Sequence, residues 1–224
     1  LVQHPAVGFV SFTGSVGGGR AVYRKVADKS FIPVGMELGG KDAAYVRADC
    51  DFDFTVSNVV EGAMYNAGQS CCAIERVYVA HEVYDRFVEA AVAATKAWYV
   101  GDPQAGAPLG PMAKPGAVDH LSDQVAGARR SGARSLCGGR PTQHEGRGRF
   151  FEPTLVADVN HRMDIEREES FGPVLALSAV RSDEEAIEAI NRSRYGLTAS
   201  VWSTSVSAAK LIMPQLDVGT VILN

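Results

Sequence analysis

Residues 74–98 read IERVYVAHEVYDRFVEAAVAATKAW, and the spacing of their apolar residues changes partway along the stretch. Residues 74–80 are rich in Val and Tyr, which favours a β-strand. The apolar residues that come next are spaced by four, four, three and four positions: Val83, Phe87, Ala91, Ala94 and Trp98. That spacing places them on one face of an α-helix. A strand followed by an amphipathic helix predicts a layered α/β domain.

The same alternation continues along the chain. Further strands are expected at residues 7–12, 32–38, 43–46, 133–137, 151–156, 174–180, 198–202 and 218–223. Further helices are expected at residues 20–29, 52–65, 117–131, 183–193 and 206–215. Ser182 with Glu185 forms a capping-box pattern, and Ser205 is the expected cap of the last helix. The glycine-rich segments 101–116 and 138–149 are expected to be a loop and an exposed connection.

Composition excludes several classes of protein. The 224 residues carry 26 acidic and 22 basic side chains, a net charge of −4, which argues against nucleic-acid and polybasic membrane partners. No apolar run approaches the length of a membrane span, and no secretory leader pattern is present, so a cytoplasmic protein is expected. The four cysteines are too few for a disulfide scaffold, and no Cys-x-x-Cys pair suggests a metal site.

Cys71 is the first candidate for chemistry. It follows residues 66–70, Asn-Ala-Gly-Gln-Ser, whose Asn and Gly are expected to end the preceding helix. Cys71 is therefore expected on a turn between a helix and a strand, where a thiol can reach a substrate. Taken alone, the position favours a small buried thiol over a reactive one.

Glu37 is the second candidate. It stands in Glu-Leu-Gly-Gly-Lys, residues 37–41, at the carboxyl end of an expected strand, where open α/β sheets bind ligands. Partial burial among Val34, Met36 and Leu38 would suit this carboxylate to act as a general base. The alternative is a strand-end Glu paired with a nearby Lys or Arg.

Two further motifs have features of ligand-binding segments. Residues 12–15, Phe-Thr-Gly-Ser, lead through Gly19 into an expected helix, and such a turn can present N–H groups to an anion. Glu169 and Phe171 precede a Gly-Pro turn into a strand, where they could hold a ribose hydroxyl and cover a flat ring. Each motif alone also fits an ordinary turn, or a surface Glu beside a core Phe.

Taken together and in order, these motifs resemble the aldehyde dehydrogenase superfamily. That family pattern is Phe-Thr-Gly-Ser, Glu-Leu-Gly-Gly-Lys, Gly-Gln-x-Cys and Glu-x-Phe-Gly-Pro, and all four elements occur here. Asn191 with residues 195–197, and residues 219–221 with Asn224, also agree. The resemblance covers essentially the whole chain. It implies a three-layer αβα catalytic domain at residues 39–224, preceded at 1–38 by the end of a Rossmann-like cofactor domain.

The resemblance also implies roles for individual residues. Cys71 would be the nucleophile and Glu37 the general base, which activates water to hydrolyse a thioester. Cofactor contacts to NAD or NADP would come from Gly14, Ser15, Leu38, Glu169 and Phe171. The substrate tunnel would be lined by Tyr65, Asn66, Ser70 and Cys72. The expected substrate is a small-molecule aldehyde. Family chains are about twice this length, and a homodimer or homotetramer is expected for the full-length parent protein.

Some features depart from the family pattern or leave other functions open. Residues 16–18 are Val-Gly-Gly where many members carry Thr-Glu before the last Gly, which could change how a diphosphate is held. An inactive aldehyde-dehydrogenase-like fragment with a structural or binding role is the main alternative. A cysteine hydrolase would need a histidine base, and neither His120 nor His161 lies in a recognisable motif.

Overall fold

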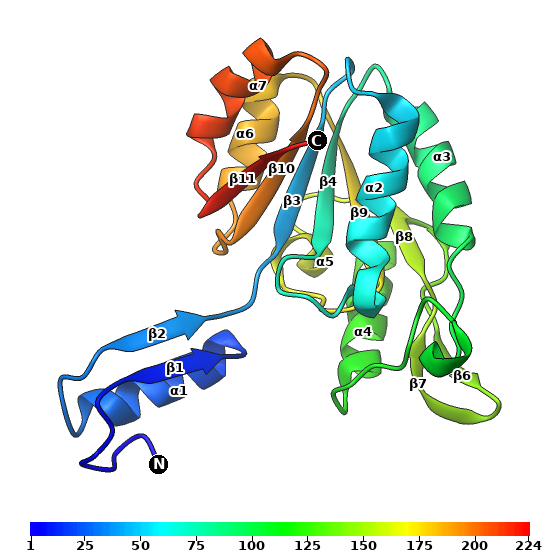
Figure 1. The fold of residues 1–224 in the computed structure, drawn as a ribbon. Helices are drawn as coiled ribbons and strands as arrows, with labels where there is room; N and C mark the ends of the chain where they lie inside the picture. The colour runs from blue at the N-terminus through cyan, green and yellow to red at the C-terminus, as the bar shows by residue number, and fades with distance from the viewer. The chain divides into compact units, whose positions relative to one another are not determined.

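The computed structural model describes residues 1–224, which form two compact units, Leu1–Gly39 and Gly40–Asn224 (Figure 1). We call them the first unit and the second unit. The division falls one residue after the boundary expected from the sequence. None of the helices combines the length and the hydropathy that crossing a bilayer requires.

The first unit is a single strand–helix–strand element. Strand β1 (Val10–Thr13) pairs in parallel with β2 (Val34–Glu37), and α1 (Val16–Ala27) connects them. The helix begins four residues earlier than expected, because Ser15 caps it: the Ser15 Oγ accepts a hydrogen bond from the Gly18 N–H at 3.1 Å. The glycines at 17 and 18, which we expected to precede the helix, form its first turn.

The second unit contains a seven-stranded sheet in the order β11-β10-β3-β4-β9-β8-β5. The strands are β3 (Asp42–Val46), β4 (Ile74–Ala80), β5 (Arg134–Cys137), β8 (Thr154–Ala157), β9 (Val174–Val180), β10 (Thr198–Trp202) and β11 (Thr220–Leu223). All neighbouring strands are parallel except β5, which runs antiparallel to β8. The α/β class expected from the alternating pattern is confirmed.

Helices cover both faces of this sheet. They are α2 (Phe52–Met64), α3 (Tyr84–Lys96), α4 (Ala117–Arg130), the short α5 (Asp164–Arg167), α6 (Asp183–Asn191) and α7 (Val206–Ile212). The first two lie on one face and α6 and α7 on the other (Figure 1). Along β3, Ala44 and Val46 join the core beneath α2 and α3, whereas Ala43 and Tyr45 join the core beneath α6 and α7. This alternation gives the expected three-layer arrangement.

The segment 138–149 is not the plain connection that we expected. It contains most of a hairpin of β6 (Pro141–His144) and β7 (Arg147–Phe151), with left-handed backbone at Glu145 and Gly146 in the turn. The strand expected at 151–156 is accordingly two strands, β7 and β8, separated by Glu152 and Pro153. Exposed, polar hairpin strands lack the apolar run that marks a buried strand, which explains the error.

Short 3₁₀ helices complete the unit. They are η1 (Tyr65–Gly68), η2 (Pro103–Ala105) inside the expected loop 101–116, and η3 (Met213–Gln215). The last expected helix therefore ends as an α-helix at Ile212, just before Pro214. Both expected serine caps are confirmed, since Ser182 accepts from the Glu185 N–H and Ser205 from the Ala208 N–H.

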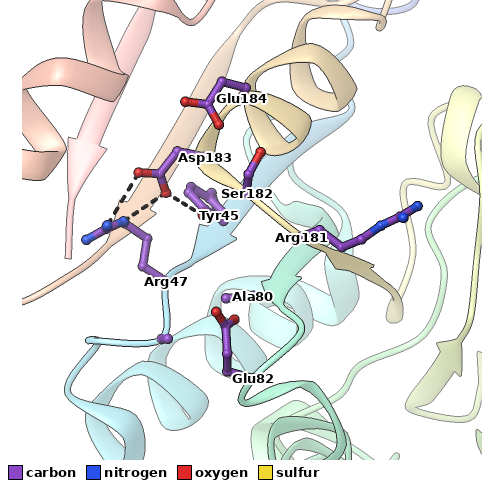
Figure 2. Close-up of a pocket in the computed structure, with 9 residues that line it drawn as sticks. Tyr45, Arg47, Ala80, Glu82, Arg181, Ser182, Asp183 and Glu184 are labelled. Carbon is purple, nitrogen blue, oxygen red and sulfur yellow. Dashed lines mark hydrogen bonds and ion pairs between the residues drawn. The ribbon is translucent and has the colours of Figure 1, made fainter.

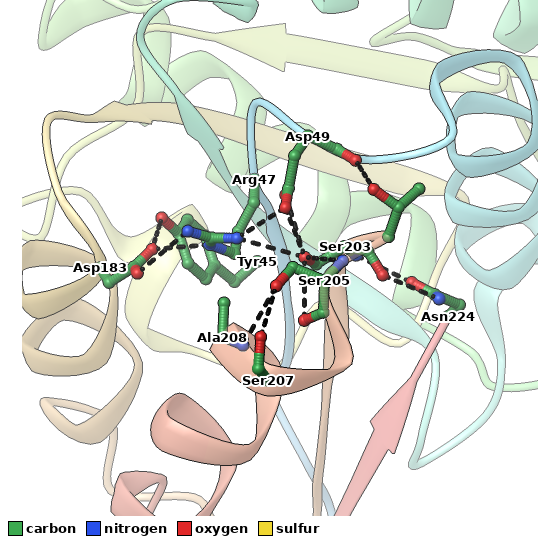
Figure 3. Close-up of polar contacts among 10 residues, drawn as sticks. Tyr45, Arg47, Asp49, Asp183, Ser203, Ser205, Ser207, Ala208 and Asn224 are labelled. Carbon is green, nitrogen blue, oxygen red and sulfur yellow. Dashed lines mark hydrogen bonds and ion pairs between the residues drawn. The ribbon is translucent and has the colours of Figure 1, made fainter.

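A polar network ties together the carboxyl ends of β3 and β10 (Figure 3). The Arg47 guanidinium donates to both carboxylate oxygens of Asp183 and to Asp49. Ser203 donates to Asp49, and its backbone N–H and C=O bond to the side chain of Asn224. The network lies at the carboxyl ends of the strands, and the candidate site described next lies at their amino ends.

Candidate active site

Three segments of the second unit meet at the amino ends of β3, β4 and β9. The Gly40 N–H donates to Glu169 Oε1 at 3.0 Å. A Cβ at Gly40 would lie 2.2 Å from the carbonyl oxygen of Cys71. A Cβ at Gly68 would lie 2.0 Å from the carbonyl oxygen of Gly172. The motifs around Gly40, Cys71 and Glu169, far apart in sequence, are therefore in direct contact.

Cys71 lies on a turn, as predicted. Helix α2 ends at Met64, and the left-handed backbone of Asn66 and Ala67 in η1 reverses the chain. The Asn66 side chain donates to the carbonyl oxygen of Gln69 at 2.9 Å and fixes the reversal. Cys71 thus lies between a helix and a strand, on a turn that is stabilised by a hydrogen bond between two of its own residues.

The thiol environment differs between the two neighbouring cysteines. Cys71 is partly buried and Cys72 is exposed, with its Sγ 3.3 Å from Ser70 Oγ. Burial raises the pKa of Cys71, and the neighbouring Cys72 and Asp42 add to the rise. The Cys71 N–H makes a hydrogen bond within its own residue that opposes this rise, and it donates to no other residue. Burial therefore outweighs this hydrogen bond, and the pKa of the Cys71 thiol lies above its usual value.

Gln69 anchors this turn to another loop, a role that sequence reasoning did not assign. Its Oε1 accepts from the Ala113 N–H at 2.8 Å, and its Nε2 donates to the carbonyl oxygen of Pro111 at 3.3 Å. An amide side chain can bond a backbone donor and a backbone acceptor at once, and a Glu could not. The Gln of Gly-Gln-x-Cys is thus explained by its contacts.

The segment with Glu169 and Phe171 is held from several sides. Burial raises the pKa of Glu169, opposed by the hydrogen bond from Gly40. His120 and Gln124, one turn apart on α4, both bond the carbonyl oxygen of Glu169. Phe171 has a left-handed backbone with φ 51°, and its ring is exposed. The segment therefore presents a half-buried carboxylate and an open aromatic face, which suits a ribose hydroxyl and a flat heterocycle.

The tunnel residues named from the resemblance lie on or beside the same turn. Tyr65 and Asn66 are exposed in η1, and Ser70 is partly exposed next to Cys71. Together with Cys72 they surround the nucleophile candidate along the chain. Their part in binding a substrate stays a prediction.

The first unit carries the other candidates. Glu37 is exposed at the end of β2, so the expected burial among its apolar neighbours is not observed. Its carbonyl oxygen accepts from the Gly14 N–H at 3.0 Å. Leu38 packs on α1 so closely that a Cβ at Gly19 would lie 2.6 Å from its Cδ2. The Ser15 hydroxyl caps α1 by accepting from the Gly18 N–H, whereas the N–H groups of Val16 and Gly17 have no intrahelical partner because they begin the helix. The roles of Glu37, Gly14, Ser15 and Leu38 stay predictions.

A cavity of about 300 Å³ lies at the carboxyl ends of β3, β4 and β9, opposite to the amino ends that carry the candidate site (Figure 2). It is lined by Tyr45, Arg47, Ala48, Ala80, Glu82, Arg181, Ser182, Asp183 and Glu184. The arginines already have carboxylate partners, Arg47 with Asp183 and Arg181 with Glu185. None of the candidate catalytic or cofactor residues lines it.

Comparison with known proteins identifies the family. Residues 1–224 match the sequence model of the aldehyde dehydrogenase family. The chain is 37% identical to lactaldehyde dehydrogenase from Escherichia coli (strain K12), over 100% of this chain and 47% of that protein. The crystal structure of the Escherichia coli lactaldehyde dehydrogenase matches with a TM-score of 0.94 at 37% identity, over 100% of this chain and 46% of that one.

Two structures solved with cofactors also match. An indole-3-acetaldehyde dehydrogenase with NAD⁺ gives a TM-score of 0.96 at 31% identity, over 100% of this chain and 46% of that one. An NADP-dependent glyceraldehyde-3-phosphate dehydrogenase from Bacillus halodurans C-125, with NADP, gives 0.90 at 35% identity, over 99% and 45%. The chain belongs to the aldehyde dehydrogenase family. It spans about half the length of the relatives that it matches.

Proposed function

We propose that the gene product containing this chain oxidises an aldehyde to a carboxylic acid with a nicotinamide dinucleotide. The observation that carries the proposal is the partly exposed Cys71, held on a braced turn in contact with the Gly40 and Glu169 segments. A nucleophile beside a carboxylate and an open aromatic ring is what an aldehyde and a nicotinamide require together.

In this proposal, Cys71 and Glu37 carry out different steps of the reaction. The Cys71 thiolate adds to the aldehyde carbon, and the Cys71 N–H donates to the oxygen that becomes negative. A bound nicotinamide cofactor would accept the hydride from the carbon attached to Cys71, which would leave a thioester on Cys71. Glu37 takes a proton from water, the hydroxide attacks the thioester, and the C–S bond breaks to release the carboxylic acid and the Cys71 thiolate, after which Glu37 passes its proton to solvent.

The cofactor assignment rests on two independent fits. In the second unit, Glu169 keeps Oε2 free of protein partners, and Phe171 exposes its ring. In the first unit, the start of α1 offers N–H groups near Ser15 to a diphosphate. Relatives solved with NAD⁺ and with NADP support a nicotinamide dinucleotide of either kind.

A trapping experiment tests the function. The complete gene product is incubated with a panel of aldehydes and NAD⁺ or NADP⁺, reduced cofactor is followed by absorbance, and acyl adducts are mapped by mass spectrometry. We expect reduced cofactor and an adduct on Cys71. Cys71→Ala should abolish turnover, whereas Cys72→Ala should only reduce it. Intact turnover by Cys71→Ala would contradict the assignment of the nucleophile.

The base is tested separately. Glu37→Gln should keep a burst of reduced cofactor while acyl-enzyme accumulates, because only the attack of water is slowed. Loss of the burst without accumulating acyl-enzyme would count against the role of Glu37. No cofactor reduction with any aldehyde, while Cys71 still reacts with iodoacetamide, would favour the inactive alternative.

We also propose that the complete gene product assembles as a homodimer or homotetramer. Both edge strands of the large sheet, β11 and β5, carry unpaired backbone groups on one side, and such edges are commonly covered by assembly. Sedimentation equilibrium tests this, and a monomer across the micromolar range would contradict it.

A further inference from the structure

Glu75 is a buried carboxylate in the middle of the candidate site, and the proposed reaction does not use it. It lies near the start of β4 and is 3% exposed. Its Oε2 accepts from the Lys41 Nζ at 2.6 Å and from the Ser170 N–H at 2.7 Å, and its Oε1 accepts from the Phe171 N–H at 2.8 Å. Lys41 is 1% exposed, and its Nζ also donates to Ser170 Oγ at 2.8 Å.

Such a buried pair is costly unless its geometry is good and its remaining hydrogen bonds are satisfied. Here the geometry is good, because Glu75 binds one ammonium and two successive backbone N–H groups, and the Lys41 ammonium also donates to Ser170 Oγ. The bonds also act on a strained backbone. Phe171 has φ 51°, a conformation that costs on the order of 1–2 kcal/mol for a residue with a side chain. The bond from its N–H to Glu75 holds the residue in that conformation.

The segment Glu169–Phe171, which these bonds hold in place, carries both candidate cofactor contacts of the second unit. Glu169 precedes Ser170, and Phe171 follows it, so any movement of the Ser170 backbone displaces the carboxylate and the ring together. Gly40, next to Lys41, donates to Glu169. The Lys41–Glu75 pair therefore lies behind the surface formed by Gly40, Glu169 and Phe171.

We propose that Glu75, oriented by Lys41, is a positioning residue that sets the Glu169–Phe171 segment in the conformation that binds the nicotinamide end of the cofactor. The proposal rests on the proposed function. Glu75 acts through Ser170 and Phe171 and touches neither substrate nor cofactor. Its effect falls on cofactor binding and not on binding of the aldehyde.

Glu75→Gln is the test variant, because it keeps the shape and one acceptor but removes the charge that binds Lys41 and two N–H groups. Asp183→Asn is the matched control, since it neutralises a paired carboxylate at the carboxyl ends of the strands, away from the candidate site. If Glu75→Gln does not fold, the double variant Lys41→Met/Glu75→Gln removes the buried cation as well and takes its place.

Two readouts are measured on the complete gene product. In steady-state kinetics, Glu75→Gln should raise KM for NAD⁺ or NADP⁺ by about tenfold or more and leave KM for the aldehyde within about twofold. In the cofactor-free protein, the amides of residues 170 and 171 should exchange with deuterium faster than in wild type. Asp183→Asn should change neither readout.

The outcomes separate the two proposals. A folded Glu75→Gln variant with wild-type KM for the cofactor overturns the positioning role, whatever its amide exchange. Equal increases in both KM values also overturn it, because they indicate a general structural effect. A wild-type protein that reduces neither NAD⁺ nor NADP⁺ contradicts the proposed function. In that case, amide exchange at 170 and 171 that is unchanged in Glu75→Gln overturns the positioning role too, and faster exchange supports it.

Discussion

Gly40 approaches the carbonyl oxygen of Cys71 so closely that a Cβ at this position would stand 2.2 Å from that oxygen. The same Cβ would lie 3.0 Å from Asp42 Oδ1. The Gly40 N–H is meanwhile bonded to Glu169. A side chain at position 40 would therefore push the turn of Cys71 away from the Glu169 segment, which explains why the motif needs glycine here.

Gly40→Ala should damage both stability and reactivity. Backbone atoms cannot yield as a flexible side chain can, so we expect a loss of about 1–3 kcal/mol in the free energy of unfolding. The displaced turn should also change the rate at which Cys71 reacts with iodoacetamide. Urea unfolding and peptide mapping measure the two effects.

Gly127→Ala is the control for this substitution. Gly127 lies inside α4, and a Cβ there would meet only the Arg130 Nη2 at 3.8 Å. Alanine should stabilise the helix by about 0.5–1 kcal/mol. Equal stability of the two variants would show that the contact between Gly40 and Cys71 is looser than the structure has it.

The reactivity of Cys71 should rise with pH and stay low near neutrality. Burial first, and Cys72 second, raise the pKa of Cys71, so its thiolate fraction at pH 7 is below that of a free cysteine. Cys72→Ala should lower the pH at which alkylation of Cys71 is half-maximal. Site-resolved labelling between pH 6 and about 10 measures this. A half-maximal pH in wild type below that of a free cysteine peptide would show that other groups activate the thiol.

The parts of the fold that were predicted best are the buried parallel strands. The bounds of β4, β9 and β10 agree with the expected ranges, because strands covered on both faces are nearly continuous apolar runs. The β6–β7 hairpin and α5 were missed. Their residues are mostly polar or exposed, and the four residues of α5 are too few to show a helical period.

The candidate site was predicted where its motifs are local in sequence. The turn at Cys71 could be read from its neighbours. The bonds of Glu75 could not, since they join residues 34 and 95 positions apart. The one available signal was a charged pair, Glu75 and Arg76, inside an otherwise apolar strand. The rule that ligands bind at carboxyl strand ends also failed to indicate these segments, because Gly40, Cys71 and Phe171 precede their strands.

Asp183→Asn should weaken the polar network at the carboxyl ends of β3 and β10. Burial alone would raise the pKa of Asp183, but hydrogen bonds from Arg47 and Tyr45 outweigh it, and the pKa lies below the usual range. A lowered carboxyl pKa stabilises the fold above the unfolded value, and this stability is lost as pH falls through the folded value. Wild type and variant should therefore differ at pH 7 and converge in acid, with a difference of about 1 kcal/mol for this partly exposed pair. Thermal unfolding against pH measures it, and a constant gap down to pH 2 would be inconsistent.

Asp42→Asn should have the opposite pH dependence. Burial raises the pKa of Asp42 from 3.8 to about 6, although Thr198 donates to it from both its N–H and its hydroxyl. Because the folded state then binds the proton more tightly than the unfolded state, stability from this group is present below pH 3.8 and is lost as pH rises through about 6. The asparagine keeps an acceptor for the Thr198 N–H, and the hydroxyl can rotate to accept from its amide. The variant should therefore be more stable than wild type at pH 8, by on the order of 2–3 kcal/mol, and equally stable near pH 4. Since the Asp42 charge also raises the pKa of Cys71, the same variant should alkylate faster at pH 8. A variant that is less stable than wild type at pH 8 would show that the two bonds from Thr198 outweigh the cost of burying the charge.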